Sequence, residues 1–281
     1  RRGFSGMLCP MSTPSLACRY EVLPGGSLAE RLQNARRFEF DAVSFPGRFL
    51  ATHESQLRSL GREAPVAMGY LSLGFEGSLV SPDVVVRARC RDSLRRLFVL
   101  CREVGLRGVN VPPVLLQDNP VRYPYRAGDE RSVHAQDAHL LEELPALSAE
   151  ARLFGLLLLL EPVNRSESEY LNTLGHAAAV CGRIGSEDLG VTCDFYHARL
   201  EEPDVPAAIR AAGRWIRHVH VAGPTRAEPG PGDVDFTPGF RALKETGYTG
   251  MIELECRSLS GPADRVLPRS AAYLRRTWEQ A

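Results

Sequence analysis

Four residues of the types that bind metal ions each stand directly after a short apolar run. They are Glu161 after residues 156–160, Asp194 after 189–193, His220 after 216–219, and Glu255 after 251–254. Three carboxylates and one imidazole that converge on one point would bind a hard divalent cation. The residue types therefore predict a metal-dependent enzyme, provided that the fold brings the ends of the four runs together.

Strand alternation does not decide between two candidates for each of two ligands. Side chains two residues apart in a strand point to the same face, so His218 could replace His220 and Glu253 could replace Glu255. A single carboxylate after a strand is also more often a helix cap or a solvated charge than a ligand. The metal hypothesis therefore depends on the four residues taken together.

The elements that would position these residues alternate between strand and helix patterns about eight times. Strands are predicted at residues 15–23, 42–46, 65–73, 107–111, 156–160, 189–193, 216–219 and 251–254. Helices are predicted at 28–38, 51–60, 81–105, 133–154, 170–184, 205–212, 238–246 and 263–278. Ser27 and Glu30 fit a capping box for the first helix. Residues 117–131 have the composition of an active-site loop.

This alternation predicts an α/β protein with a closed parallel sheet, a single-domain (β/α)8 TIM barrel. A Rossmann or flavodoxin-like sheet is the main competitor, but no glycine-rich phosphate motif follows any strand. We expect residues 15–281 to form the catalytic barrel and residues 1–14 to be an N-terminal leader or an expression remnant. Active sites of such barrels lie at the carboxyl ends of the strands, where the four candidate ligands stand.

Composition predicts a small-molecule partner. Lys and Arg total 34 and Asp and Glu also total 34, without long blocks of either sign, so the charge pattern of a nucleic-acid or anionic-membrane protein is missing. No run approaches the length of a membrane span. The seven cysteines show no CxxC pairing or regular spacing, which favours a reducing cytoplasm over a disulfide framework.

Several of these segments also match the motifs of a known family. They are Glu-Pro-Val-Asn-Arg-Ser-Glu at 161–167, Asp-Phe-Tyr-His at 194–197, His-Val-His-Val-Ala at 218–222, and Gly-Tyr-Thr-Gly at 247–250 before Glu255. In this order and spacing the chain resembles the xylose isomerase-like TIM barrels, and within them the D-tagatose 3-epimerase group of ketose epimerases and isomerases. The resemblance is specific only from residue 156 onward.

The resemblance implies a role for each matching residue. It selects Glu161, Asp194, His220 and Glu255 as the metal ligands, with Glu253 kept as a minor alternative. It also implies that His197 and Arg226 contact substrate oxygens, and that Glu167 orients the side chains of the substrate site.

The chemistry of sugar epimerisation is consistent with these roles. A proton beside a carbonyl leaves slowly unless the enediolate that forms is stabilised, and a divalent cation can do this. Glu161 and Glu255 would then remove and return the proton as catalytic residues. Oxygen-rich ligands favour Mn²⁺, with Mg²⁺, Co²⁺ or Zn²⁺ as alternatives. The hypothesis is a cytoplasmic metal-dependent ketose epimerase or isomerase that acts on a small sugar, with a homodimer or a homotetramer as the candidate assemblies.

Three other functions were weighed. A dehydratase or lyase on a polyol ketone or keto acid would use the same metal and enolate. An apurinic endonuclease would need further ligands in the second and third strands, where residues 42–46 and 65–73 offer none. A non-catalytic sugar-binding relic would have lost site residues that this chain keeps.

The other residues that could take part in chemistry are expected to be structural. The histidines outside the strand ends, His53, His134, His139 and His176, read as surface or packing residues. Cys193 and Cys256 read as core thiols that point away from the site. Phe45, Tyr70, Phe195 and Tyr196 could stack on a sugar but more often such aromatic residues pack in the core.

Overall fold

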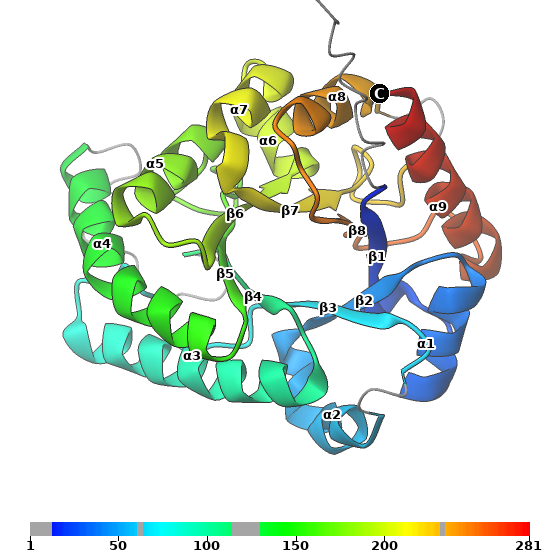
Figure 1. Cartoon of the computed structure of the whole chain (residues 1–281), viewed down its shortest axis with the longest axis horizontal. Coiled ribbons are helices and arrows are strands. Elements are labelled where there is room, and N and C mark those ends of the chain that lie inside the picture. The colour runs from blue at the N-terminus through cyan, green and yellow to red at the C-terminus, as the bar shows by residue number, and fades with distance from the viewer. Residues whose placement is uncertain (1–12, 61–63, 114–129, 231–233) are drawn as a thin grey trace, which may run out of the picture.

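A closed barrel of eight parallel strands forms the centre of the computed structural model, which describes residues 13–60, 64–113, 130–230 and 234–281. Each strand pairs with its neighbours in chain order, and the last pairs with the first (Figure 1). The strands are β1 (Ser15–Arg19), β2 (Ala42–Pro46), β3 (Ala67–Ser72), β4 (Gly108–Val111), β5 (Leu157–Leu160), β6 (Leu189–Asp194), β7 (Ile216–Val221) and β8 (Met251–Leu254).

Helices surround the barrel and cover its outer face (Figure 1). The long helices are α1 (Leu28–Arg37), α2 (Gly47–Leu60), α3 (Val84–Val104), α4 (Glu130–Leu153), α5 (Leu174–Ile184), α7 (Val205–Ala212), α8 (Thr237–Glu245) and α9 (Ala263–Gln280). A shorter helix, α6 (Phe195–Glu201), directly follows β6, and the 3-10 turns are η1 (Tyr20–Val22) and η3 (Gly213–Trp215). The predicted TIM barrel of the α/β class is confirmed.

The period-2 alternation of the strands divides the core in two. Strand residues that face the helices, such as Leu158, Val219 and Leu254, join the large apolar cluster between barrel and helices. Residues of the opposite parity, such as Leu159 and Met251, join a small cluster that also includes Ala17, Ala42 and Tyr70 inside the barrel. Burial of the larger cluster provides most of the hydrophobic stabilisation, because that is where most of the apolar surface leaves water.

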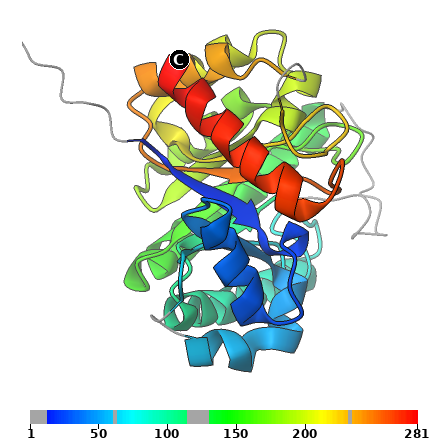
Figure 2. The ribbon, with the colours of Figure 1, turned by 90° about the vertical axis from the view of Figure 1, so that its right-hand side faces the viewer.

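The first and last elements meet where the barrel closes. Figure 2 shows α9, in red, beside the blue segments of β1 and α1. Arg275 of α9 donates to the carbonyl of Glu39 at 2.7 Å and to Asp41 Oδ2 at 3.0 Å, and Asp41 Oδ2 also accepts from the backbone N–H of Leu16. The closing helix is thereby tied to the first two strands.

Most predicted elements appear within a few residues of their expected bounds. The capping box of Ser27 and Glu30 at the start of α1 is confirmed. The predicted first strand is too long, because the chain turns into η1 after Arg19. The predicted helix at 170–184 is also too long, because Thr173 caps α5 and residues before it form a loop. The short helix α6 was not predicted.

Two predictions concern segments that lie mostly outside the described residues. The loop at 117–131 lies outside the described residues except for Glu130 and Arg131, which begin α4. The segment 1–14 is described only at its last two residues, so its nature stays a prediction.

Among the helices that the structure describes, none combines the length and apolar content needed to cross a membrane.

Candidate metal centre and substrate pocket

The four predicted ligands meet at the carboxyl ends of β5 to β8. Each of Glu161, Asp194, His220 and Glu255 offers a ligand atom, and these atoms lie within 4.8 Å of one another. His220 Nδ1 is 2.9 Å from Glu161 Oε1 and 3.4 Å from Glu255 Oε2. Such a group of oxygen and nitrogen atoms can surround one cation, although the role of these residues as ligands stays a prediction.

The local sequence explains how each ligand reaches this point. Asp194 is the last residue of β6 and the N-cap of α6, where its Oδ1 accepts from the backbone N–H of Tyr196 at 2.7 Å. Its second oxygen, Oδ2, takes no part in this cap and accepts from Arg226 Nη1 at 3.2 Å. Glu161 and Glu255 each follow a strand, and their backbone N–H groups extend the sheet by donating to the carbonyls of Val111 and Val221.

A buried chain of hydrogen bonds fixes Glu161 from below. Asn110 Nδ2 donates to Glu161 Oε2 at 2.6 Å, and Thr192 Oγ1 donates to Asn110 Oδ1 at 2.7 Å. Both Asn110 and Thr192 are fully buried in strands of the barrel. Because Oε2 is occupied in this way, Oε1 is the oxygen of Glu161 that faces His220.

Arg19 at the end of β1 is a site residue that the sequence predictions missed. Its Nη1 donates to Glu255 Oε1, and its side chain is only 12% exposed. The signal was present, because an arginine at the end of the otherwise uncharged strand Ser15–Arg19 is unusual. An arginine is not a metal ligand, so the search for ligand types at the strand ends gives it no role.

The charges of the cluster determine which groups carry protons. Burial alone would lower the pKa of His220, but Glu255, Glu161 and Glu253 outweigh it and raise that pKa well above its usual range. Burial would raise the pKa of Glu255, but His220 and Arg19 hold it well below the usual range. In the absence of a cation, His220 is therefore protonated and Glu255 is ionised at neutral pH.

The pKa of Asp194 is raised above its usual value, whereas that of Glu255 is lowered. Burial raises its pKa, and the nearby Glu255 adds to this effect, against His197 and Arg226. Two carboxylates this close favour opposite protonation states when no cation separates them. A cation bound between the carboxylates of Asp194 and Glu255 would reduce their mutual repulsion.

The donor set fits a divalent cation. Four side chains with carboxylates and at most 16% exposure, Glu161, Asp194, Glu253 and Glu255, face two similarly buried guanidinium groups, those of Arg19 and Arg226. The excess of two negative charges matches the charge of a divalent ion with neutral histidines. Carboxylate oxygens and one imidazole nitrogen suit Mn²⁺, Mg²⁺ or Co²⁺, and the absence of a thiolate argues against a structural zinc site.

The three predicted substrate contacts lie beside the cluster. His197 Nε2 is 3.5 Å from Asp194 Oδ2, and its Nδ1 accepts from the backbone N–H of Asn164 at 3.2 Å. This second contact would place the proton of a neutral imidazole on Nε2, which lies 3.5 Å from Asp194 Oδ2 and 3.3 Å from Arg226 Nη1. Glu167 accepts from Asn164 Nδ2 at 3.2 Å and from Arg257 at 2.8 Å.

Arg226 is held in an unusual backbone conformation. Its φ of 61° lies in the left-handed region, which costs a residue with a Cβ about 1 kcal/mol or more. A turn with Gly223 and a hydrogen bond from the N–H of Arg257 to its carbonyl hold it there. The guanidinium lies 4.4 Å from the ring centroid of Tyr196 and donates to Asp194 Oδ2 at 3.2 Å. Its Nε is buried and has no hydrogen-bond partner among the described residues.

A cavity of about 270 Å³ opens above these residues. Its wall includes all three substrate candidates together with Glu161, Glu255 and Arg19, while Arg48 and Arg257 stand at its exposed rim. This size suits a small polar molecule. A larger cavity of about 910 Å³ lies at the opposite ends of the strands, beside Asp41 and Arg107, but it borders residues 61–63, which are not described, and neither possible metal cluster among the described residues lies there.

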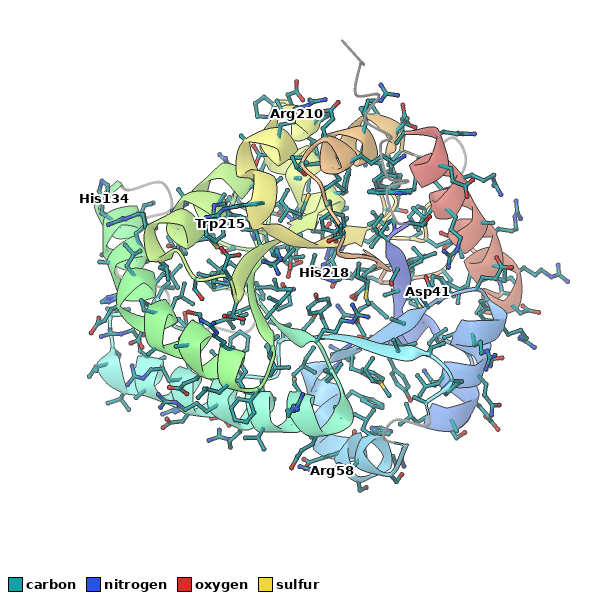
Figure 3. All side chains as sticks on the ribbon, in the orientation of Figure 1. Asp41, Arg58, His134, Arg210, Trp215 and His218 are labelled. Carbon is teal, nitrogen blue, oxygen red and sulfur yellow. The ribbon has the colours of Figure 1, made fainter. Side chains whose placement is uncertain are left out.

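The other residues considered in the sequence have structural contacts. The wall of the 270 Å³ cavity contains none of Phe45, Tyr70, Phe195 and Tyr196. Phe45 stacks on Phe49, and Tyr70 packs against His218. Figure 3 shows His218 inside the barrel, whereas Arg58, His134 and Arg210 lie on the outer helices.

The two cysteines beside ligands differ from each other. Cys193 is fully buried in the outer apolar core, as predicted. Cys256 is also a buried free thiol, but it belongs to the wall of the 270 Å³ cavity, so the prediction that it points away from the site is wrong. The strand alternation that led to this prediction ends at Leu254, before Cys256.

Comparison with known proteins connects this geometry to a family. A sequence model described as xylose isomerase-like TIM barrel matches residues 32–277. The chain is 31% identical to L-ribulose 3-epimerase of Mesorhizobium japonicum, over 89% of this chain and 82% of that protein. It is 36% identical to a ketose 3-epimerase of Arthrobacter globiformis, over 88% and 83% of the two chains. A solved structure of L-ribulose 3-epimerase superposes with a TM-score of 0.78 at 25% identity and covers 95% of each chain.

Proposed function

Because the chain belongs to the xylose isomerase-like TIM-barrel family, we propose that it is a divalent-metal-dependent sugar epimerase of the ketose 3-epimerase type. The relatives named above are epimerases, so the predicted isomerase class agrees with them. The observation that carries the proposal is the convergence of Glu161, Asp194, His220 and Glu255, because two of them, Glu161 and Glu255, line a sugar-sized cavity.

We propose that these four side chains hold one cation, with Mn²⁺ preferred and Mg²⁺, Co²⁺ or Zn²⁺ as alternatives. A divalent cation at this position would supply the positive charge that stabilises the enediolate form of the substrate. The chain contributes three carboxylate oxygens and His220 Nδ1 on one side of the cluster.

Glu161 and Glu255 would move the proton. They extend from β5 and β8, which are separated by β6 and β7 in the barrel, so their carboxylates approach the cavity from different strands. Each has one oxygen held by a fixed donor, Asn110 for Glu161 and Arg19 for Glu255. Glu255 has a low pKa and is ionised, so it would accept the proton from one face, while Glu161 would return to the other face a proton that it has taken up from solvent.

His197, Arg226 and Glu167 would orient the sugar. A neutral His197 with its proton on Nε2 can donate to a hydroxyl or carbonyl oxygen. The guanidinium of Arg226, which belongs to the wall of the cavity, can donate to a second oxygen. Glu167 can accept from a hydroxyl and is also hydrogen-bonded to Asn164, which contacts His197. Together these groups would set the position of the carbon between Glu161 and Glu255.

The proposal can be tested with a panel of free and phosphorylated ketoses, assayed by chromatography after the protein has been stripped with a chelator. We expect one or a few ketoses to convert into a mixture with the C3 epimer when Mn²⁺ is added, and no conversion without a cation. A product that has lost water would indicate a dehydratase instead. Conversion that is unaffected by the chelator would refute the metal role.

A further inference from the structure

A second glutamate, Glu253, lies beside His220 inside the barrel. The two residues are Cα partners in the ladder between β7 and β8, and alternation places Glu253 on the same face as Glu255, one level deeper. Its side chain is completely buried. Since a buried carboxylate is costly without partners, its contacts should reveal its role.

One oxygen of Glu253 is fully engaged. Oε2 accepts from Ser44 Oγ at 2.5 Å and from His218 Nε2 at 3.0 Å. The Ser44 hydroxyl is itself held, because its oxygen accepts from the backbone N–H of Tyr70 at 3.0 Å. These contacts from β2 and β7 fix the plane of the carboxylate and leave Oε1 to face the neighbouring imidazole.

Two atoms here are unpaired within the described residues: Nε2 of His220 and the remaining oxygen of Glu253, which also lies 3.9 Å from Arg19 Nε. Neither Glu253 Oε1 nor His220 Nε2 has a hydrogen-bond partner, although both are buried, and they lie 3.9 Å apart. This gap exceeds a hydrogen bond by about 1 Å and is too short for a bridging water, which needs two hydrogen-bond lengths. A small shift of either side chain would join the donor and the acceptor directly.

We propose that Glu253 is a positioning residue that accepts the Nε2 proton of His220 and so holds the ring with its Nδ1 lone pair toward the cation. The inference rests on the proposed metal function. The opposite edge of the ring is consistent with it, because Nδ1 faces Glu161 and Glu255. A carboxylate behind a metal-binding histidine fixes the tautomer and the ring orientation, and its loss typically weakens metal binding about 10–100-fold.

The same residues could also be read as a second metal site, because His218, His220 and Glu253 have ligand atoms within 4.8 Å of one another. The hydrogen bonds argue against this reading. His218 Nε2 and Glu253 Oε2 already share a proton, and Oε2 accepts a second one from Ser44, so neither of these two atoms offers a free lone pair to a cation. One cation per chain is therefore expected.

The test measures metal affinity rather than activity. The dissociation constant for Mn²⁺ would be determined by competition with a chromophoric chelator for the wild type, Glu253→Gln and a matched control. Glu143→Gln is a suitable control, since Glu143 is also a buried glutamate but pairs with Arg87 and Arg91 between α3 and α4. We expect Glu253→Gln to weaken binding about 10–100-fold and Glu143→Gln to leave it unchanged.

A second variant protects the test against misfolding. Ser44→Ala removes one of the two donors that orient Glu253 and should weaken Mn²⁺ binding in the same direction but less. If Glu253→Gln does not fold, this variant decides the matter. Unchanged affinity in the folded variants would overturn the inference while the proposed function stands. Two Mn²⁺ ions per wild-type chain and one in Glu253→Gln would also overturn it. A wild type that binds no cation would instead refute the proposed function.

Discussion

Arg19 shows how a single residue sets the electrostatics of the site. Its guanidinium contacts Glu255 and also lies 3.9 Å from Glu253 Oε1. Together with His220 it keeps the pKa of Glu255 low despite burial. At the residue scale, the site is therefore an arrangement of charges in which the predicted ligands depend on neighbours that are not ligands.

Removal of this positive charge should shift the pH profile. In Arg19→Gln the pKa of Glu255 should rise, so the carboxylate would be protonated at a higher pH. The acid limb of kcat/KM should move upward in pH relative to the wild type. The pH dependence of both proteins would be measured with Mn²⁺ in excess, and Arg95→Gln, which removes an exposed partner of Glu150, is the control. An unmoved acid limb would show that Arg19 does not act through Glu255.

The two proposed proton carriers can be tested separately. Glu161→Gln and Glu255→Gln should each lower kcat by about two orders of magnitude or more, since loss of a general acid or base typically has this effect. His139→Gln, on the outer side of α4, should be nearly silent. Initial rates at saturating Mn²⁺ would separate lost proton transfer from weakened metal binding. If Glu255→Gln kept wild-type turnover, the two-glutamate mechanism would have to be abandoned.

The elements were easier to predict than their contacts. The strands Ala42–Pro46 and Met251–Leu254 and the helix Val205–Ala212 have the predicted bounds, because apolar runs and turn residues delimit them locally. The helix α6 was missed because it has only seven residues, too few for a clear amphipathic pattern. For Asp194 a helix cap was considered only as the alternative to a ligand role, whereas the structure shows that this candidate ligand is also the N-cap of α6.

Most contacts between elements that are distant in the sequence could not be predicted. Nothing in the local sequence relates Asn110 to Glu161, or Ser44 to Glu253, because these pairs meet only through the register of the closed barrel. Glu253 was considered only as a substitute for Glu255, since alternation gives the face of a strand but not the depth along the barrel. The donors that hold Glu161 and Glu253, namely Asn110 and Ser44, could therefore be identified only in the structure.

One such contact ties α4 to the segment that carries Glu167. Asp137 Oδ1 in α4 accepts from Tyr170 Oη at 2.6 Å and from His176 Nε2 at 2.7 Å. Burial would raise the pKa of Asp137, but these two hydrogen bonds lower it below its usual value. A carboxyl with a lowered native pKa stabilises the fold above its unfolded pKa of about 3.9, and this stabilisation is lost as the pH falls through the native pKa.

Asp137→Asn should therefore be destabilising near neutral pH, by about 1 kcal/mol, the usual worth of a side-chain hydrogen bond. Below about pH 4 the difference from the wild type should shrink, because the wild-type carboxyl becomes neutral as well. Urea unfolding at several pH values would measure both effects. A difference that stays constant into acid would show that the charge of Asp137 does not contribute.

At the scale of the whole molecule, the site lies where all eight strands end, so a cation there would connect β5 to β8. Ligand binding to the native state alone should stabilise the chain, by about 2.7 kcal/mol when free Mn²⁺ is about 100 times Kd. Thermal unfolding with and without Mn²⁺ would show this as a rise in Tm that a chelator reverses. Asp194→Asn, which keeps an N-cap oxygen on α6, should lose most of the rise. An equal rise in this variant would place the cation elsewhere.

The most direct test of the account is the fate of the carbon-bound proton. A ketose that the Mn²⁺-loaded enzyme converts would be incubated in deuterated water and followed by NMR. The account predicts an epimer that carries deuterium at the inverted carbon, with neither epimer nor exchange after the cation is removed. Inversion of the carbon with no deuterium in either product or recovered substrate, or a product that has lost a hydroxyl, would contradict it.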